Sequence, residues 1–363
     1  MKRIDSLFIL FVSLVIISSG CNAQKPLNKN SLDSFIRKKA DSLYNSSKVP
    51  GITIAILNNG ERNYYNFGFA DKEKKTVFDS TTLFEIGSIT KTFTAYALEA
   101  VLKEKEISDT GSVIQYLPDS VQLNKLLAPI TFVSLMNHTS GLPRLPDNMP
   151  LSEDNKTPYD TYTSNDLFTY LQKCVPKPDG KSNYSNLGAG LAGVLAERIA
   201  GKSYAALLDK YIFLPFKIVT PDKSIVKTEK SQGYFENDKT PYWNMDVLAP
   251  AGGLKCSGNE MLTYLQAMSI PVNLESKELI DKLLVPTISI NTQINVCRAW
   301  HTLEQKDKPI IYWHNGGTYG FSTFAAFIKG ENKAVIVAVN QFNKNAISDA
   351  LGIAIIKKLT AEE

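Results

Sequence analysis

The sequence predicts an α+β fold in which both chain ends build one antiparallel sheet with helices on it and the middle builds a helical lobe. Runs rich in β-branched residues occur near the two ends, at about 52–69 and 322–340. Helical periodicity dominates the section between them. We therefore expect a sheet lobe at about 31–87 and 285–363 and a helical lobe at about 88–284, with a small-molecule site between them.

A helix and a hairpin are expected first. Apolar residues at helical spacing predict the helix, and they are Leu32, Phe35, Ile36, Ala40 and Leu43. Ile52–Leu57 follows as a strand, because it is rich in β-branched residues. Asn59-Gly60 then gives a tight turn before the returning strand Tyr64–Phe69.

The middle section reads as helices between long loops. Helical patterns lie at Thr92–Lys103, Gly188–Ala200 and Asn259–Met268. Proline- and asparagine-rich stretches at Pro143–Pro158 and Thr220–Pro241 are expected to be loops.

Strand patterns return near the C-terminus. Ser322–Ile328 and Ala334–Asn340 flank a predicted hairpin turn at Lys329–Asn332. Ile347, Leu351, Ala354 and Ile355 mark an amphipathic helix that ends the chain.

The composition is that of a globular protein. Of the 363 residues, 44% are hydrophobic and 21% are charged, which excludes a disordered chain. The 40 Lys and Arg exceed the 36 Asp and Glu by only four, and they are scattered. This excess is too small for a nucleic-acid-binding protein, so we expect no nucleic-acid partner. We also expect a monomeric chain.

The first residues form a targeting signal. A basic start at Lys2-Arg3 precedes the apolar run Leu7–Ile17, which is too short to span a bilayer. Cys21 follows small residues and resembles the lipid-modified cysteine of a bacterial lipobox, although Ser18 replaces the usual leucine. We expect a signal peptide over 1–23, a lipid anchor on Cys21 and a periplasmic protein on a short tether, 24–30. A soluble secreted form cut near residue 23 is the alternative.

The remaining cysteines and the histidines show no metal-ligand spacing. Cys174, Cys256 and Cys297 contain no Cys-x-x-Cys pair and allow at most one disulfide, so buried thiols are expected. His138, His301 and His314 lack a His-x-x-x-His pattern. We expect neither a metal nor a cofactor.

A serine and a lysine lie three residues apart where a helix begins. Ser88 and Lys91 would share one face of this helix. A serine needs a neighbouring base to become a nucleophile, and a lysine serves when burial or nearby positive charge lowers its pKa. The pattern alone is weak, because the chain repeats it at Ser224–Lys227.

Two further patterns strengthen this interpretation. Tyr184 and Asn186 precede the small-residue helix, where they could share a proton relay and a substrate hydrogen bond. His314-Asn315-Gly316-Gly317 lies beside the C-terminal strands. Its glycines would let a substrate lie against a strand edge.

Together the three patterns resemble the signature elements of class C β-lactamases and their relatives, which include D-alanyl-D-alanine peptidases, D-amino-acid amidases and family VIII esterases. Five segments carry the resemblance: Phe84–Phe93, Leu135–Leu142, Tyr184–Gly188, Pro250–Leu254 and Gly316–Phe321. It covers roughly Leu32 to Leu359. It implies a three-layer α/β/α fold of the β-lactamase/transpeptidase type and a structural role for the His138 loop.

The resemblance also implies catalytic roles. Ser88 would attack a carbonyl and hold the acyl group, while Lys91 and Tyr184 would share the base and acid steps. Which of the two is the resting base stays open. Asn186 would hydrogen-bond an amide of the acyl part, and the backbone N–H groups of Ser88 and Gly317 would form an oxyanion hole.

The chain departs from the β-lactamase pattern at two positions. His314 and Asn315 stand where class C β-lactamases carry the lysine and threonine that face the drug's carboxylate. A histidine with an ordinary pKa is mostly neutral at pH 7, which weakens the attraction for an anion. If His314 still bound a carboxylate as an imidazolium, KM for anionic substrates should fall towards pH 6.

Because His314 and Asn315 replace the lysine and threonine, we rank the functional hypotheses as follows. An exported serine hydrolase of small amides, D-amino-acid peptides or esters comes first. A β-lactamase that opens the β-lactam ring is the alternative within the same chemistry. A penicillin-binding sensor that is acylated without turnover is the alternative of another class.

Overall fold

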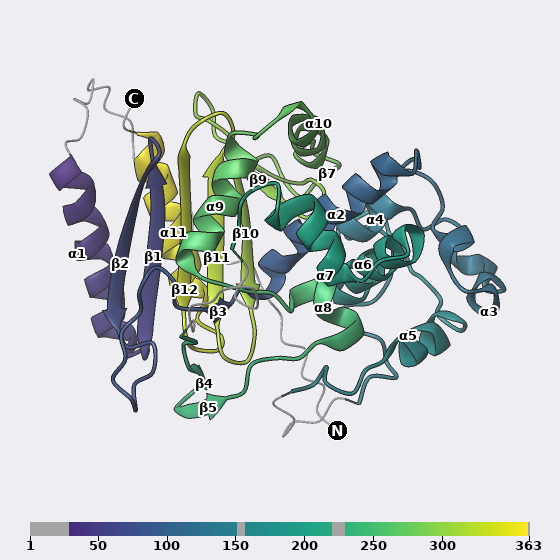
Figure 1. Cartoon of the computed structure of the whole chain (residues 1–363), viewed down its shortest axis with the longest axis horizontal. Helices are drawn as coiled ribbons and strands as arrows, with labels where there is room; N and C mark the ends of the chain where they lie inside the picture. The colour runs from purple at the N-terminus through teal and green to yellow at the C-terminus, as the bar shows by residue number, and fades with distance from the viewer. Residues whose placement is uncertain (1–28, 151–156, 220–228, 362–363) are drawn as a thin grey trace.

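The computed structural model describes residues 29–150, 157–219 and 229–361. Its main feature is an eight-stranded sheet with the order β2-β1-β12-β11-β10-β9-β8-β7 (Figure 1). The strands are β1 Gly51–Asn58, β2 Glu61–Gly68, β7 Ile288–Ser289, β8 Ile294–Val296, β9 His301–Leu303, β10 Ile311–Gly317, β11 Ser322–Ile328 and β12 Lys333–Val339. The predicted antiparallel sheet from both chain ends is therefore confirmed.

The sheet joins the two chain ends through β1 and β12. Ile54 of β1 faces Tyr65 of β2 on one side and Val337 of β12 on the other. Strands β7 to β9 were not predicted, because two or three residues are too few to show an alternating pattern.

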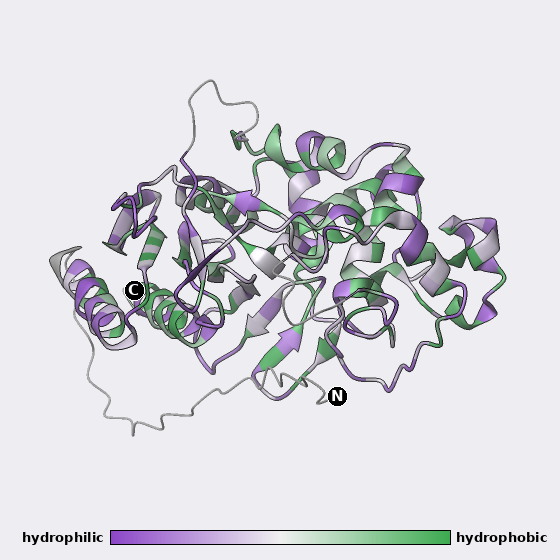
Figure 2. Cartoon of the chain, turned by 90° about the horizontal axis from the view of Figure 1, so that it is seen from below, coloured by the Kyte–Doolittle hydropathy of each residue, from purple (hydrophilic) through white to green (hydrophobic). Residues whose placement is uncertain are grey.

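Helices α1, Lys29–Ser47, and α11, Asn345–Thr360, cover one face of the sheet (Figure 1). Ile36 and Leu351 from these helices lie in one apolar cluster with Ile54 and Val337 from the strands. Viewed from below, the helices carry both hydrophilic and hydrophobic segments (Figure 2). Such amphipathic helices are stabilised mainly by burying their apolar side against the sheet.

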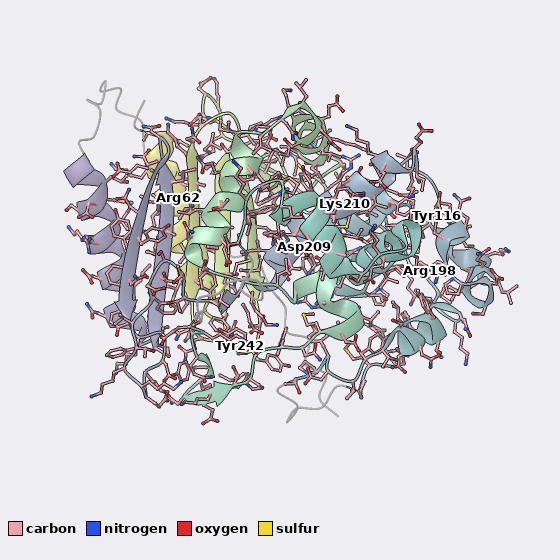
Figure 3. All side chains as sticks on the ribbon, viewed as in Figure 1. Arg62, Tyr116, Arg198, Asp209, Lys210 and Tyr242 are labelled. Carbon is pink, nitrogen blue, oxygen red and sulfur yellow. The ribbon has the colours of Figure 1, made fainter. Side chains whose placement is uncertain are left out.

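Helix α9, Gly258–Ser269, covers the opposite face of the sheet, where it packs on β1, β11 and β12. Arg62 of β2 reaches across to it, with Nη1 donating to Asn259 Oδ1 at 2.7 Å and Nη2 to Gln266 Oε1 at 2.9 Å (Figure 3). The three layers confirm the predicted fold class. However, α9 falls within the range predicted for the helical lobe, because its periodicity does not say which surface it covers.

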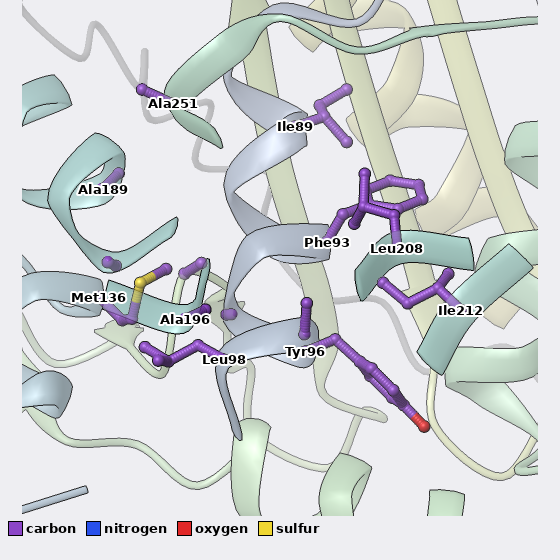
Figure 4. Packing of buried hydrophobic residues seen from close by; sticks show 14 of the residues in the cluster. Ile89, Phe93, Tyr96, Leu98, Met136, Ala189, Ala196, Leu208, Ile212 and Ala251 are labelled. Carbon is purple, nitrogen blue, oxygen red and sulfur yellow. The ribbon is translucent and has the colours of Figure 1, made fainter. Parts of the chain in front are cut away.

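The helical lobe is built around α2, Thr90–Glu104, which is buried along almost its whole length. Phe93 and Leu98 of α2 pack among Ala196 of α6, Leu208 of α7 and Met136 of α4 (Figure 4). The other helices are α3 Asp119–Gln122, α4 Phe132–Met136, α5 Ser164–Leu171, α6 Asn186–Ala200, α7 Tyr204–Leu208, α8 Ala249–Gly252 and α10 Leu274–Leu283. The same apolar cluster continues into the sheet, so the two lobes share one core.

Short strands connect the lobes and correct one predicted loop. β3, Phe84–Glu85, pairs with β6, Lys255–Cys256, beside the start of α2. β4, Gly233–Phe235, and β5, Asp238–Thr240, form a hairpin inside the stretch predicted as a loop. These strands have only two or three residues each, so propensity did not mark them.

Several predictions concern residues outside the described ranges. The signal peptide, Cys21 and the second Ser-x-x-Lys copy at Ser224–Lys227 all lie there. The tether predicted to end at residue 30 overlaps α1, which begins at Lys29. Across the described ranges, no helix is long and apolar enough to cross a membrane. Cys174, Cys256 and Cys297 are buried thiols, as predicted.

A buried ion cluster fixes the far end of α2. The Arg298 guanidinium contacts Asp109 Oδ2 at 2.5 Å and Glu99 Oε1 at 3.2 Å. Lys282 of α10 contacts the same two carboxylates, Glu99 at 2.7 Å and Asp109 at 3.2 Å. Burial raises the pKa of Glu99, whereas the hydrogen bonds and charge of Arg298 outweigh burial and lower the pKa of Asp109. The cluster thus neutralises two carboxylates inside the protein.

We predict that Arg298→Met lowers the free energy of unfolding by about 3–5 kcal/mol, because it leaves buried carboxylates without their main cation. Lys277→Met is the matched control, since Lys277 pairs with Asp281 on an exposed helix face and should cost less than about 1 kcal/mol. Urea unfolding of both variants measures the difference. Equal losses would contradict a structural role for the cluster.

Candidate active site

Ser88 lies in a tight turn between β3 and α2. The 3₁₀-helix η1, Gly87–Ile89, carries it directly into α2. Gly87 has a φ of +53°, and a Cβ there would lie 2.7 Å from the backbone N of Gly317. Only glycine fits this conformation and this close approach. The turn therefore holds Ser88, which is partly exposed, against the end of β10.

Lys91 is completely buried one turn into α2. Its Nζ lies 3.1 Å from Ser88 Oγ, 2.8 Å from Asn186 Oδ1 and 2.6 Å from the carbonyl oxygen of Ala251. Burial lowers the pKa of Lys91 well below its usual value, and the positive charge of Arg144 lowers it further. No acidic side chain appears among the hydrogen-bond partners of this amine in the described residues.

Close packing of α8 on α6 brings the Ala251 carbonyl to Lys91. A Cβ at Gly193 of α6 would lie 2.2 Å from the Pro250 side chain. The small residues of α6 therefore give the Pro250 segment room to approach the buried end of Lys91. The pattern Pro250–Leu254 was part of the sequence resemblance, but a backbone carbonyl has no side-chain signature from which its role could be predicted.

Tyr184 and Asn186 flank the start of α6. Ser185 caps this helix by accepting a hydrogen bond from Gly188 N at 2.8 Å. The cap directs Asn186 to Lys91, while the Tyr184 ring centre lies 4.8 Å from Lys91 Nζ. Burial raises the pKa of Tyr184 to about 12, although a hydrogen bond with Ser88 and the charge of Arg144 act to lower it. The structure thus brings Ser88, Lys91, Tyr184 and Asn186 together, as the sequence predicted.

His138 and Arg144 support Tyr184 from the preceding loop. The His138 ring centre lies 4.5 Å from that of Tyr184, and its Nδ1 accepts from Ser185 N at 3.2 Å. These contacts agree with a structural role for the His138 loop. The Arg144 guanidinium carbon lies 5.1 Å from the Tyr184 ring centre. The sequence reasoning missed Arg144, because no pattern distinguishes it from other surface cations.

His314 and Asn315 point to opposite faces of the sheet, as neighbours in a strand must. His314 is 1% exposed, and its Nδ1 lies 2.5 Å from Asn315 O. Burial lowers its pKa well below the usual value, and His301 and Lys91 add to the effect. Burial therefore favours the neutral imidazole, which argues against a role for His314 as an imidazolium that binds a carboxylate.

Asn315 faces α11 instead of the helical lobe. Its Nδ2 donates to Asp349 Oδ2 at 2.9 Å. Gly316, next in the strand, accepts through its carbonyl from Asn345 Nδ2 at 2.8 Å. Gly317 ends the strand and is exposed beside the Ser88 turn.

A buried glutamate ties the two sides of the site together. Glu85 Oε2 accepts from Thr318 Oγ1 at 2.6 Å, and Oε1 accepts from the backbone N of Trp243. Burial raises the pKa of Glu85 despite these hydrogen bonds and the nearby charge of Lys255. Because Glu85 precedes Ser88 by three residues and Thr318 follows Gly317, the bond between them fixes the distance between the Ser88 turn and β10.

Comparison with known proteins gives a consistent result. The family model described as β-lactamase matches residues 32–358. A β-lactamase of Providencia stuartii is 24% identical over 94% of this chain and 94% of its own length. One from Pseudomonas fluorescens is 29% identical over 66% of each chain. One from Escherichia coli is 25% identical over 75% of this chain and 68% of its own length.

We predict that Thr318→Val lowers the free energy of unfolding by about 1–3 kcal/mol, because it leaves the buried Glu85 carboxyl with one hydrogen bond fewer. Thr318→Ser keeps the hydroxyl and serves as the control. Urea unfolding compares the two variants. Because valine keeps the shape of threonine, a Thr318→Val variant as stable as the wild type would contradict a contribution from this hydrogen bond.

Proposed function

The chain belongs to the β-lactamase family of serine hydrolases, and we propose that it cleaves small amides, D-amino-acid peptides or esters through an acyl-Ser88 intermediate. The observation that carries the proposal is the buried Lys91 amine 3.1 Å from Ser88 Oγ. An uncharged amine at this distance can accept the serine proton as Oγ attacks a carbonyl.

Burial favours the neutral form of Lys91, and the contacts of the amine can accommodate that form. A neutral amine has two hydrogens and one lone pair. The hydrogens can be donated to Asn186 Oδ1 and to the Ala251 carbonyl, which lie 2.8 and 2.6 Å away. The lone pair is then left for the Ser88 hydroxyl. We therefore assign Lys91 as the resting base.

Tyr184 has the opposite property. With a pKa of about 12 it stays protonated at neutral pH, so it can donate its proton to the leaving group and regain one from Lys91. Water would release the acyl group by the same transfers in reverse. Asn186 would hydrogen-bond an amide of the acyl part.

The backbone N–H groups of Ser88 and Gly317 would form the oxyanion hole, with Gly316 and Gly317 leaving room for the substrate. Their proximity supports this assignment, since the Gly87 turn lies directly against Gly317. Donors fixed by backbone packing need no rearrangement as negative charge develops on the substrate oxygen.

Hydrolysis of the β-lactam ring is the second candidate. The names of the relatives favour it. The neutral, buried His314 counts against it, because a charged lysine faces the drug's carboxylate in class C β-lactamases. A penicillin-binding sensor would share the acylation step but stop after one equivalent.

We propose that the protein is exported and anchored in a membrane through a lipid on Cys21. The basic start, the short apolar run and the small residues before Cys21 support this proposal. The catalytic residues would then face the periplasm, and the chain would act as a monomer.

The acyl-enzyme is tested by intact-protein mass spectrometry with nitrocefin, a fluorescent penicillin and p-nitrophenyl butyrate. We expect a transient adduct on Ser88 with continuing turnover, and a loss of at least about 10³-fold in kcat for Ser88→Ala. Ser224→Ala, in the second Ser-x-x-Lys copy, is the matched control. An adduct without turnover would identify a sensor, and no Ser88-dependent adduct or turnover would refute the proposal.

The pH profile tests the assignment of the base. As pH falls through the lowered pKa of Lys91, the amine gains a proton and can no longer accept one from Ser88. We therefore expect kcat to fall on the acidic side only, because Tyr184 keeps its proton up to about pH 12. Tyr184→Phe should lower kcat by about 10²-fold and leave the acidic limb in place. If the decrease of kcat at acidic pH disappears in Tyr184→Phe, the resting base is Tyr184 instead.

A further inference from the structure

The end of β10 beside the Ser88 turn carries a partly buried carboxylate from α11. Asp349 accepts from Asn315 Nδ2 at 2.9 Å through Oδ2 and from Ser348 Oγ at 3.3 Å through Oδ1. No lysine, arginine or histidine forms an ion pair with Asp349 within the ranges that the structure describes. Its negative charge is therefore compensated only by neutral donors.

The position of α11 places Asn345, one helical turn before Asp349, beside the proposed oxyanion hole. Asn345 donates to the Gly316 carbonyl at 2.8 Å. Its Oδ1 would lie 3.3 Å from a Cβ on Gly317. Asn345 and Asp349 thus flank the backbone between Asn315 and Gly317, and the last of these residues is exposed beside Ser88.

Among the described residues, the cations near this strand end do not contact Asp349: the charge of Lys255 acts on Glu85, and Lys344 is bonded through its backbone N to Ser322. His314 is neutral, and its side chain lies on the face of β10 opposite to Asn315. Lys91 and Arg144 lie with Tyr184 and Asn186, at the start of α6. Burial raises the pKa of Asp349 to about 7, and the hydrogen bonds from Asn315 and Ser348 act against this rise. At pH 8 the side chain is therefore mostly a carboxylate.

We propose that Asp349 is a specificity-determining residue that disfavours a carboxylate on the leaving group and favours a neutral or cationic one. The inference rests on the proposed acyl-Ser88 function, in which the acyl part lies by Asn186 and the leaving group extends along the end of β10. A leaving-group carboxylate would there meet a like charge in a partly desolvated place. An amide N–H or an ammonium would instead find an acceptor.

The test uses one acyl group esterified to three alcohols: lactate, lactamide and choline. Their leaving groups are anionic, neutral and cationic at pH 8. We expect the wild-type protein to give a kcat/KM at least about tenfold lower for the lactate ester than for the other two. A wild-type preference for the lactate ester would overturn the proposal.

Asp349→Asn removes the charge while keeping an acceptor for Asn315. We expect the lactate-to-lactamide ratio of kcat/KM to rise about tenfold in this variant, and Asp349→Glu to keep the wild-type ratio. Glu278→Gln, which removes one negative charge from exposed α10, is the matched control and should leave the ratio unchanged. An unchanged ratio in Asp349→Asn would overturn the proposal.

A second substrate pair separates the two sides of the scissile bond. Succinyl and butanoyl esters of lactamide differ only by a carboxylate in the acyl part, and Asp349→Asn should not change their ratio. A change there would refute the assignment of Asp349 to the leaving group. Ser88→Ala is run on every ester: absence of Ser88-dependent turnover overturns the proposed function itself, whereas turnover without charge discrimination overturns this inference alone.

Discussion

The site depends on the burial of one amine. Lys91 has no exposed surface and lies among Ser88 Oγ, Asn186 Oδ1 and the Ala251 carbonyl, which come from three different elements. Burying a charged ammonium without an acidic partner would cost several kcal/mol, roughly. The packing of α6 and α8 around α2 therefore favours the uncharged amine, which is the form that the proposed base requires.

The second constraint is the close approach of two backbones. Gly87 lets the Ser88 turn lie against Gly317, and the hydrogen bond between Glu85 and Thr318 holds the two segments together. The nucleophile at the start of α2 is thus held in a fixed position relative to the end of strand β10. Groups held in this way lose little entropy when a substrate enters between them.

The sequence predicted those features that depend on side-chain type and on the periodicity of hydrophobic residues. Ser88 and Lys91 were identifiable because their spacing places them on one face of a helix whose start was visible. The Ala251 carbonyl was not, because a backbone acceptor leaves no residue-type signal. Helix α9 was found, but periodicity does not reveal the surface that a helix covers, so its packing on the sheet could not be predicted. Strands of two or three residues, such as β7, depend on tertiary pairing instead of local preference.

The charge at the leaving-group side shows how sequence and structure contribute separately. Replacement of a lysine by His314 is visible in the sequence. The sequence alone leaves open two states of the ring, the neutral imidazole and the protonated imidazolium. Burial resolves them in favour of the neutral imidazole. Asp349 has no sequence pattern, since only the packing of α11 brings it to Asn315. A missing cation alone would merely weaken the attraction for an anion, whereas a carboxylate in addition would repel an anion that comes near it. The strand end that faces the drug's carboxylate in class C β-lactamases would therefore repel a substrate carboxylate in this protein.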